Sequence, residues 1–231
     1  MTRLYLIRHA ENTANLTKEF SHRKVDYSLT DKGRLQAEQT AKRLSDEGIR
    51  AVYSSPLRRA QETAAYIGAA CAQEVIVMEQ FREINVGILE ERPPTAENWA
   101  EHNEVLRAWR RGQLDTRFPD GEDYHMLWQR AAEGYRTVVT AHPTEAVAIV
   151  AHGGVFTATI KALCPDVDLA ELFRQENHNC SITVVDVTLD DNVLRGQLRQ
   201  WAAYDHLHGV AAEMVSGSPS PDFFTKPSTQ P

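Results

Sequence analysis

Residues 3–7 read RLYLI, and the polar run RHAENTAN follows directly at residues 8–15. The first segment is short and apolar and contains residues that favour buried strands, whereas the second is charged and polar. This change predicts a buried strand that ends in a charged loop. Such a strand delivers polar side chains to one edge of a sheet.

Strands and helices are expected to alternate along the rest of the chain. Further strands are predicted at residues 51–54, 74–78, 146–151, 181–187 and 193–201. Helices are predicted from a cap at Thr30 to about Gly48, and at residues 57–70, 122–142 and 153–163. Short connections between alternating strands and helices favour a mostly parallel sheet covered on both faces, a three-layer α/β/α sandwich.

A single domain is expected over residues 1–215, because the chain of 231 residues can form one large core and contains no internal repeat. Residues 90–121 interrupt the alternation with Pro93, Pro94 and a second break at residues 119–121, which predicts a helical lid insertion over the sheet. Residues 216–231 hold four prolines and four serines and are expected to form a flexible C-terminal tail.

The composition argues against several classes of protein. Lys plus Arg total 25 against 32 Asp plus Glu, and the net charge of −7 opposes binding to nucleic acid or to a membrane surface. Three cysteines without paired spacing argue against a disulfide framework or a four-cysteine zinc site, and favour a reducing compartment. The first fifteen residues are too polar for a signal-peptide core, and no apolar run is long enough to cross a membrane. A cytoplasmic location is therefore expected.

Charged and polar side chains follow four of the predicted strands. These residues are Arg8, His9, Arg58, Glu83 and His152. Because ligands bind beyond the carboxyl ends of the strands in open α/β sheets, all five are expected at one edge. Two arginine forks in an acidic chain indicate an anion such as phosphate, and Gly153 and Gly154 would let backbone N–H groups approach it. Each residue taken alone is equally consistent with a structural role, but their shared placement favours a phosphoryl-binding site.

Four segments also carry a family pattern. They read LIRHAENTAN at residues 6–15, SLTDKGRLQA at 28–37, YSSPLRRAQETA at 53–64 and VAHGG at 150–154. In content and order they resemble the histidine phosphatase superfamily, also called the phosphoglycerate mutase-like fold. The resemblance implies catalytic His9 and Glu83, phosphate-binding Arg8, Asn15, Arg58 and His152, no metal and no cofactor.

The resemblance implies a phosphomonoester hydrolase that acts through a phosphohistidine on a phosphorylated small molecule. Two alternatives stay open: a cofactor-dependent phosphoglycerate mutase and a catalytically silent protein that binds phosphorylated ligands. Residues 84–94, INVGILEERPP, lack the Glu-Arg-His-Tyr-Gly run that resembles a mutase, which favours hydrolysis. Specificity is expected from the lid, although Trp99, Trp109 and the arginines at 107–111 also fit packing and solvated roles. The sequence leaves a homodimer open.

Overall fold

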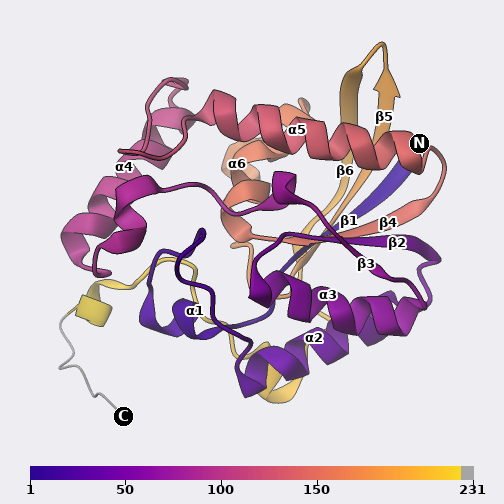
Figure 1. The fold of residues 1–231 in the computed structure, drawn as a ribbon, viewed down its shortest axis with the longest axis horizontal. Helices are drawn as coiled ribbons and strands as arrows, with labels where there is room; N and C mark the ends of the chain where they lie inside the picture. The colour runs from indigo at the N-terminus through magenta and orange to yellow at the C-terminus, as the bar shows by residue number, and fades with distance from the viewer. Residues whose placement is uncertain (225–231) are drawn as a thin grey trace.

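The central sheet has six strands in the order β3-β2-β4-β1-β5-β6 (Figure 1). In the computed structural model, which describes residues 1–224, the strands are β1 (Thr2–Arg8), β2 (Ile49–Ser54), β3 (Val75–Val77), β4 (Ala146–Ala151), β5 (Ile182–Asp190) and β6 (Val193–Ala203). The first four are parallel to one another, whereas β5 runs antiparallel to both β1 and β6. The mostly parallel sheet predicted from the sequence is confirmed.

Helices cover both faces of this sheet. The α-helices are α1 (Thr13–Thr17), α2 (Asp31–Leu44), α3 (Arg58–Cys71), α4 (Ala96–Arg110), α5 (Tyr124–Ala141), α6 (Gly153–Leu163) and α7 (Leu169–Leu172). Short 3-10 helices are η1 (Glu79–Phe81), η2 (Gly87–Glu91), η3 (Gly209–Ala212) and η4 (Pro221–Phe224). In Figure 1, α2 and α3 lie on one side of the strands, and α5 and α6 lie on the other.

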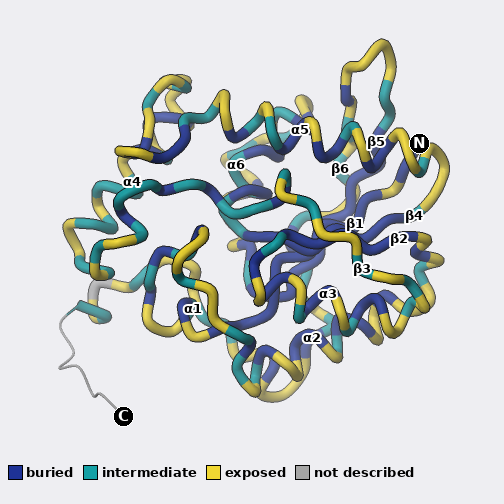
Figure 2. The backbone as a smooth tube through the Cα atoms, in the orientation of Figure 1, coloured by how far each residue is buried: buried dark blue, intermediate teal, exposed yellow. Residues whose placement is uncertain are grey.

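The core consists of a separate apolar layer on each face, because successive side chains of a strand point in opposite directions. Leu4 and Leu6 of β1 pack into the cluster that includes residues of α5 and α6. Tyr5 and Ile7 pack into the cluster that includes residues of α2 and α3. Figure 2 shows β1 and β4 buried along most of their length, with exposed positions on the outer sides of the helices. The result is the expected three-layer sandwich.

The start of α2 follows directly from the sequence. Thr30 has extended backbone geometry, and its hydroxyl accepts a hydrogen bond from the Gly33 N–H at 3.0 Å. This bond satisfies one of the N–H groups that the first helical turn leaves unpaired. The N-cap predicted at Thr30 is thereby found in the structure.

The segment at residues 90–121 contains α4, which lies with α1 at the end of the sheet where β1 finishes (Figure 1). The C-terminal segment returns to the same region. Residues 216–218 make specific contacts there, and η4 follows at Pro221–Phe224, so the expectation of a structureless tail is wrong over residues 216–224. The rest of that expected tail, residues 225–231, lies outside the described residues. In the described part of the chain, no helix combines the length and apolar character needed to cross a membrane.

Candidate active site

His9 is the first residue after β1, and its backbone is fixed on both sides. Its N–H donates to the Ala151 carbonyl at 2.9 Å, and its own carbonyl accepts from Asn179 Nδ2 at 2.9 Å. The imidazole Nδ1 lies 2.8 Å from the Ala10 carbonyl oxygen. Because a carbonyl oxygen only accepts, Nδ1 carries the proton and Nε2 keeps a lone pair.

One arginine, Arg59, connects the two histidines of the site. Its Nε donates to His9 Nε2 at 3.1 Å, and its Nη2 lies 3.0 Å from His152 Nδ1. Since a guanidinium has no acceptor, both histidine nitrogens must accept, which leaves the His152 Nε2–H to donate to Ser55 Oγ at 2.6 Å. The two imidazole rings are 5.2 Å apart, so His9 and His152 come together as predicted.

Arg58, by contrast, lies outside this cluster, and its predicted place beside His9 is wrong. Its side chain is 61% exposed and pairs with Glu62 at 2.9 Å, one turn further along α3. The buried positions of α3 lie on one side of the helix, and at about 100° per residue Arg58 lies about 180° from Ile67 in the middle of that side. Arg59 lies one turn before buried Thr63 and therefore occupies the inner face.

Burial and positive charge determine the ionisation of this cluster. Burial, followed by the charges of Arg59 and Arg8, lowers the pKa of His9 well below its usual range. Burial and the nearby charge of Arg59 likewise lower the pKa of His152. Burial lowers the pKa of Arg59 to about 10, so its guanidinium keeps its charge at neutral pH. The site therefore presents neutral imidazoles beside a cation.

Arg8 brings a second guanidinium to the same place. It is buried, and its Nη1 donates to the Asn177 carbonyl. Its Nε is also buried and has no hydrogen-bond partner within residues 1–224. A Cβ at Gly153 would come within 3.2 Å of Arg8 Cδ, which explains why the chain has no side chain at that position. The site holds two buried arginines, and no carboxylate of residues 1–224 is bonded directly to either.

Asn15 lies beside His9 and fixes the loop between β1 and α1. It forms a reciprocal capping box with Asn12: the Asn15 Oδ1 accepts from the Asn12 N–H at 3.1 Å, and the Asn12 Oδ1 accepts in return. The same Asn15 oxygen accepts from Asn179 Nδ2 at 3.1 Å. Asn179 thus ties Asn15 to the His9 backbone, and Asn15 lines the same cleft as His9.

Glu83 reaches the site from the segment that follows η1. Its Oε1 accepts from the backbone N–H groups of Ile84 at 2.9 Å and Val155 at 2.8 Å, and its Oε2 accepts from that of Gly154 at 3.1 Å. The first turn of α6 was expected to offer its N–H groups to a phosphate. Two of them, those of Gly154 and Val155, instead bind and orient the Glu83 carboxyl group, which lines the cleft with His9.

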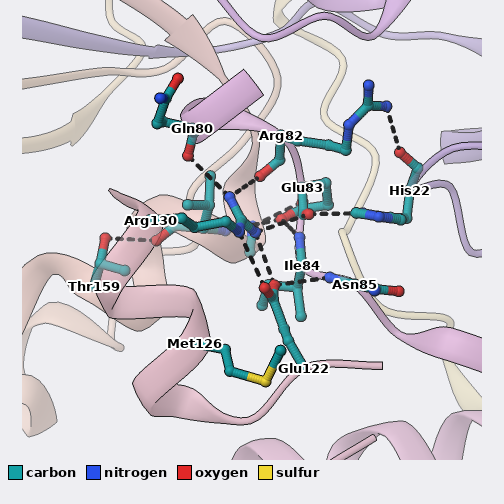
Figure 3. Close-up of polar contacts among 12 residues, drawn as sticks. His22, Gln80, Arg82, Glu83, Ile84, Asn85, Glu122, Met126, Arg130 and Thr159 are labelled. Atoms are coloured by element: carbon teal, nitrogen blue, oxygen red, sulfur yellow. Dashed lines mark hydrogen bonds and ion pairs between the residues drawn. The ribbon is translucent and has the colours of Figure 1, made fainter. Parts of the chain in front are cut away.

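The backbone that carries Glu83 is held by Arg130 of α5 (Figure 3). Arg130 Nη1 donates to the carbonyls of Gln80 at 2.9 Å and Arg82 at 2.8 Å, and Nη2 donates to the Glu83 carbonyl at 3.1 Å. Its Nε and Nη2 also donate to the buried carboxylate of Glu122 at 3.0 and 2.7 Å. All five guanidinium N–H groups are therefore used.

A cleft of about 480 Å³ is lined by Arg8, His9, Asn15, Arg59 and Glu83. One wall is an aromatic cluster in which the Phe20 ring lies 4.7 Å from Trp99 and 5.2 Å from His102. The C-terminal segment forms part of another wall: Lys18 Nζ donates to the Ser216 carbonyl at 2.6 Å, and Glu176 accepts from the Ser216 hydroxyl and the Gly217 N–H. Within residues 1–224, no group of three or more His, Cys, Asp or Glu side chains is placed to hold a metal ion.

The lid residues divide between the two roles considered for them. Trp109 is buried in the core, and Arg107 and Arg111 are exposed and pair with Glu104, which fits packing and solvated roles. Trp99 and Arg110 line the cleft. One helix thus supplies both structural and cleft-facing side chains.

Three residues of the site were not predicted from the sequence: Arg59, Ser55 and Asn179. A helical pattern was available for Arg59, because the buried positions Thr63 and Ile67 follow it at intervals of four residues. Ser55 and Asn179 have no comparable signal, since their roles depend on contacts with residues more than 90 positions away in the chain.

Known proteins resemble this chain in sequence and in fold. The sequence pattern of the histidine phosphatase superfamily (branch 1) matches residues 4–198. The "Probable phosphoglycerate mutase GpmB" of Erwinia tasmaniensis is 33% identical over 189 residues, covering 80% of this chain and 85% of that protein. A mycobacterial glucosyl-3-phosphoglycerate phosphatase solved with VO3 is 27% identical with a TM-score of 0.73, over 87% of this chain and 99% of the other. YhfR of Bacillus stearothermophilus is 26% identical with a TM-score of 0.70, over 91% of this chain and 100% of the other.

Proposed function

Because the chain belongs to the histidine phosphatase superfamily, we propose that it is a metal-independent phosphomonoester hydrolase that acts through a phosphohistidine at His9. The observation that carries the proposal is the His9 Nε2 lone pair, which faces the Arg59 guanidinium in a cleft also lined by Arg8 and Glu83. A phosphate monoester is the ligand that uses two cations, a neutral nucleophile and a carboxyl group together.

The first half-reaction transfers the phosphoryl group to the protein. Phosphate oxygens take up the N–H donors of Arg8 and Arg59, and His9 Nε2 attacks phosphorus in line with the ester oxygen. A P–N bond forms while the P–O bond breaks, and the leaving alkoxide takes a proton from the Glu83 carboxyl group. The arginines stabilise the charge that spreads over the equatorial oxygens.

The second half-reaction returns the protein to its starting state. A water molecule attacks the phosphorus of phospho-His9 and gives a proton to the Glu83 carboxylate. The P–N bond breaks, inorganic phosphate leaves, and His9 Nε2 recovers its lone pair. Each proton that Glu83 supplies in the first step is regained in the second, so the cycle needs no other reactant.

Rapid-quench labelling with a ³²P-labelled monoester tests the proposal. Wild-type protein is expected to form an acid-labile, base-stable phosphoprotein within one turnover. His9→Ala should lose this label and reduce kcat/KM by at least about 10³-fold. His125→Ala, which changes an exposed histidine, is the matched control and should keep both the label and the wild-type kcat/KM. Normal turnover by His9→Ala, or no turnover by wild-type protein on any monoester, would overturn the proposal.

Mutase activity is the second candidate, because the relative from Erwinia tasmaniensis bears the name of a probable phosphoglycerate mutase. The two reactions share phospho-His9 and differ in whether water or a bound phosphoglycerate receives the phosphoryl group. Incubation with 3-phosphoglycerate and catalytic 2,3-bisphosphoglycerate separates them. We expect release of inorganic phosphate to exceed formation of 2-phosphoglycerate, and the reverse order would identify a mutase.

A further inference from the structure

A second cavity of about 310 Å³ adjoins the cleft between α4, α6 and α7. Its apolar lining includes Leu106, Trp109, Leu114, Tyr124, Ala158 and Phe173. Phe173 is 37% exposed and presents part of its ring to this space. We call this space the apolar compartment.

The cleft and the apolar compartment share five lining residues: Leu106, Arg110, Gly154, Thr157 and Phe173. Gly154 is the most informative of these shared residues. Its N–H donates to Glu83 Oε2 at 3.1 Å, and a Cβ at this position would meet Glu83 Oε1 at 2.5 Å. The apolar compartment therefore begins within one residue of the Glu83 carboxyl group.

The charged side chains around the apolar compartment are both cations. Lys161 Nζ donates to the carbonyls of Pro165 and Val167, each at 2.7 Å. The Arg110 guanidinium lies 4.5 Å from the centre of the Phe173 ring, and both residues line the cleft as well as the apolar compartment. No acidic side chain of the described residues lines it. A neutral apolar group can enter without displacing an ion pair.

We propose that the apolar compartment binds the alcohol part of the substrate, so that the preferred substrate is a phosphomonoester of an alcohol with a sizeable apolar group. This inference rests on the proposed function. If Glu83 protonates the ester oxygen, that oxygen lies beside Glu83, and the group attached to it lies next to Gly154. The phosphate then occupies the cleft near Arg8 and Arg59, and the apolar group passes Arg110 into the apolar compartment.

The volume of the apolar compartment limits the size of the apolar group that it can bind. A cavity of about 150 Å³ lined by apolar side chains is enough to bind benzene, so about 310 Å³ accommodates a group of roughly twice that size. An eight-carbon chain is a suitable probe. Each methylene that leaves water for an apolar site contributes to affinity, so a long chain should bind better than a short one.

The test measures binding and hydrolysis separately. Isothermal titration compares octylphosphonate with ethylphosphonate, which keep the phosphoryl charge but cannot be hydrolysed. Steady-state kinetics compares octyl phosphate with ethyl phosphate, whose leaving alcohols have similar acidity. We expect wild-type protein to prefer the octyl compound by at least about tenfold in both measurements.

Ala158→Phe fills the apolar compartment and should reduce the octyl preference to less than about threefold. Ala158→Leu adds a smaller side chain and tests the same prediction with a lower risk of misfolding. Ala162→Phe is the matched control, because it lies one turn further along α6 and does not line the apolar compartment. It should keep the octyl preference.

Equal affinity of wild-type protein for the two phosphonates would overturn the inference, as would an octyl preference that both Ala158 variants retain. Neither result depends on catalysis. Absence of hydrolysis together with octyl-selective binding would instead contradict the proposed function and leave the apolar compartment supported as a binding site.

Discussion

The Arg59 Nε–H donates to His9 Nε2 at 3.1 Å, and the same guanidinium reaches His152 Nδ1 at 3.0 Å. One side chain therefore fixes which nitrogen of each imidazole holds a lone pair. Burial and, after it, the charge of Arg59 lower the pKa of both histidines, so the two imidazoles are neutral. An incoming phosphate encounters a cation and an unprotonated nucleophile already in contact.

Replacement of Arg59 should reduce activity strongly, whereas replacement of the neighbouring Arg58 should have little effect on it. Arg59→Ala is expected to reduce kcat/KM for p-nitrophenyl phosphate by at least about 10²-fold, because it removes donors to the phosphoryl oxygens. Arg58→Ala should stay within about threefold, since it loses only an exposed ion pair with Glu62. Circular dichroism checks that both variants are folded. A larger loss in Arg58→Ala than in Arg59→Ala would show that the site is assigned to the wrong arginine.

Glu83→Gln should affect esters according to their leaving groups. General acid catalysis contributes about 10²–10⁴-fold, so hydrolysis of an alkyl phosphate should slow by that factor. A nitrophenyl phosphate needs less proton donation and should slow less in the formation of phospho-His9, which single-turnover kinetics measures. Equal losses for the two esters in that step would count against Glu83 as the proton donor.

Arg130→Lys should impair the position of Glu83 without touching substrate. A lysine has three N–H donors and cannot replace the five bonds that Arg130 makes to three carbonyls and to Glu122. We expect kcat to fall more for an alkyl than for a nitrophenyl ester, the same selective loss as in Glu83→Gln. Arg136→Lys on the same helix is the control. Equal losses for both esters would indicate a purely structural role for Arg130.

Stability should fall as the pH drops from about 6.5 to about 4, and His206 accounts for part of this loss. Burial lowers its pKa to about 4 from 6.5, so the unfolded chain takes up a proton over this range while the folded protein does not. Its full contribution to stability is present above pH 6.5. Because the His206 side chain is only partly buried, solvent screening reduces its contribution. The expected loss in the free energy of unfolding at pH 5 is therefore about 1–2 kcal/mol.

His206→Gln is the variant that isolates this contribution, because it keeps a donor for Thr40 Oγ1. Urea unfolding at pH 8 and pH 5 should show a smaller pH-dependent loss in the variant than in wild-type protein. An unchanged difference between the two pH values would contradict the lowered pKa.

The sequence was sufficient for the sheet and for most of the site because these depend on local patterns. Apolar residues of β1 are followed at once by Arg8 and His9, and the carboxyl ends of parallel strands meet at one edge of a sheet. His152 follows β4 in the same way, and the register pairs Arg8 with Ala151, which places the two histidines side by side. Strand order did not need to be known for this inference.

Contacts between distant segments could not be predicted in this way. Residues 216–218 have the composition of a free tail, yet Lys18 and Glu176 bind them, and both partners are far away in the sequence. The hydrogen bonds of Arg130 to the backbone around Glu83 likewise depend on the docking of α5 against η1. Such contacts form only after the layers pack.

The sequence by itself determined the alternation of strands and helices, the three-layer architecture, the strand ends that carry His9 and His152, and the segment after β3 that carries Glu83. These follow from apolar periodicity and chain direction, which are properties of short segments. Only the tertiary structure placed the Arg59 guanidinium between His9 and His152. This placement depends on which side of α3 packs against the sheet, and that side includes Arg59 and Ala60 but not Arg58.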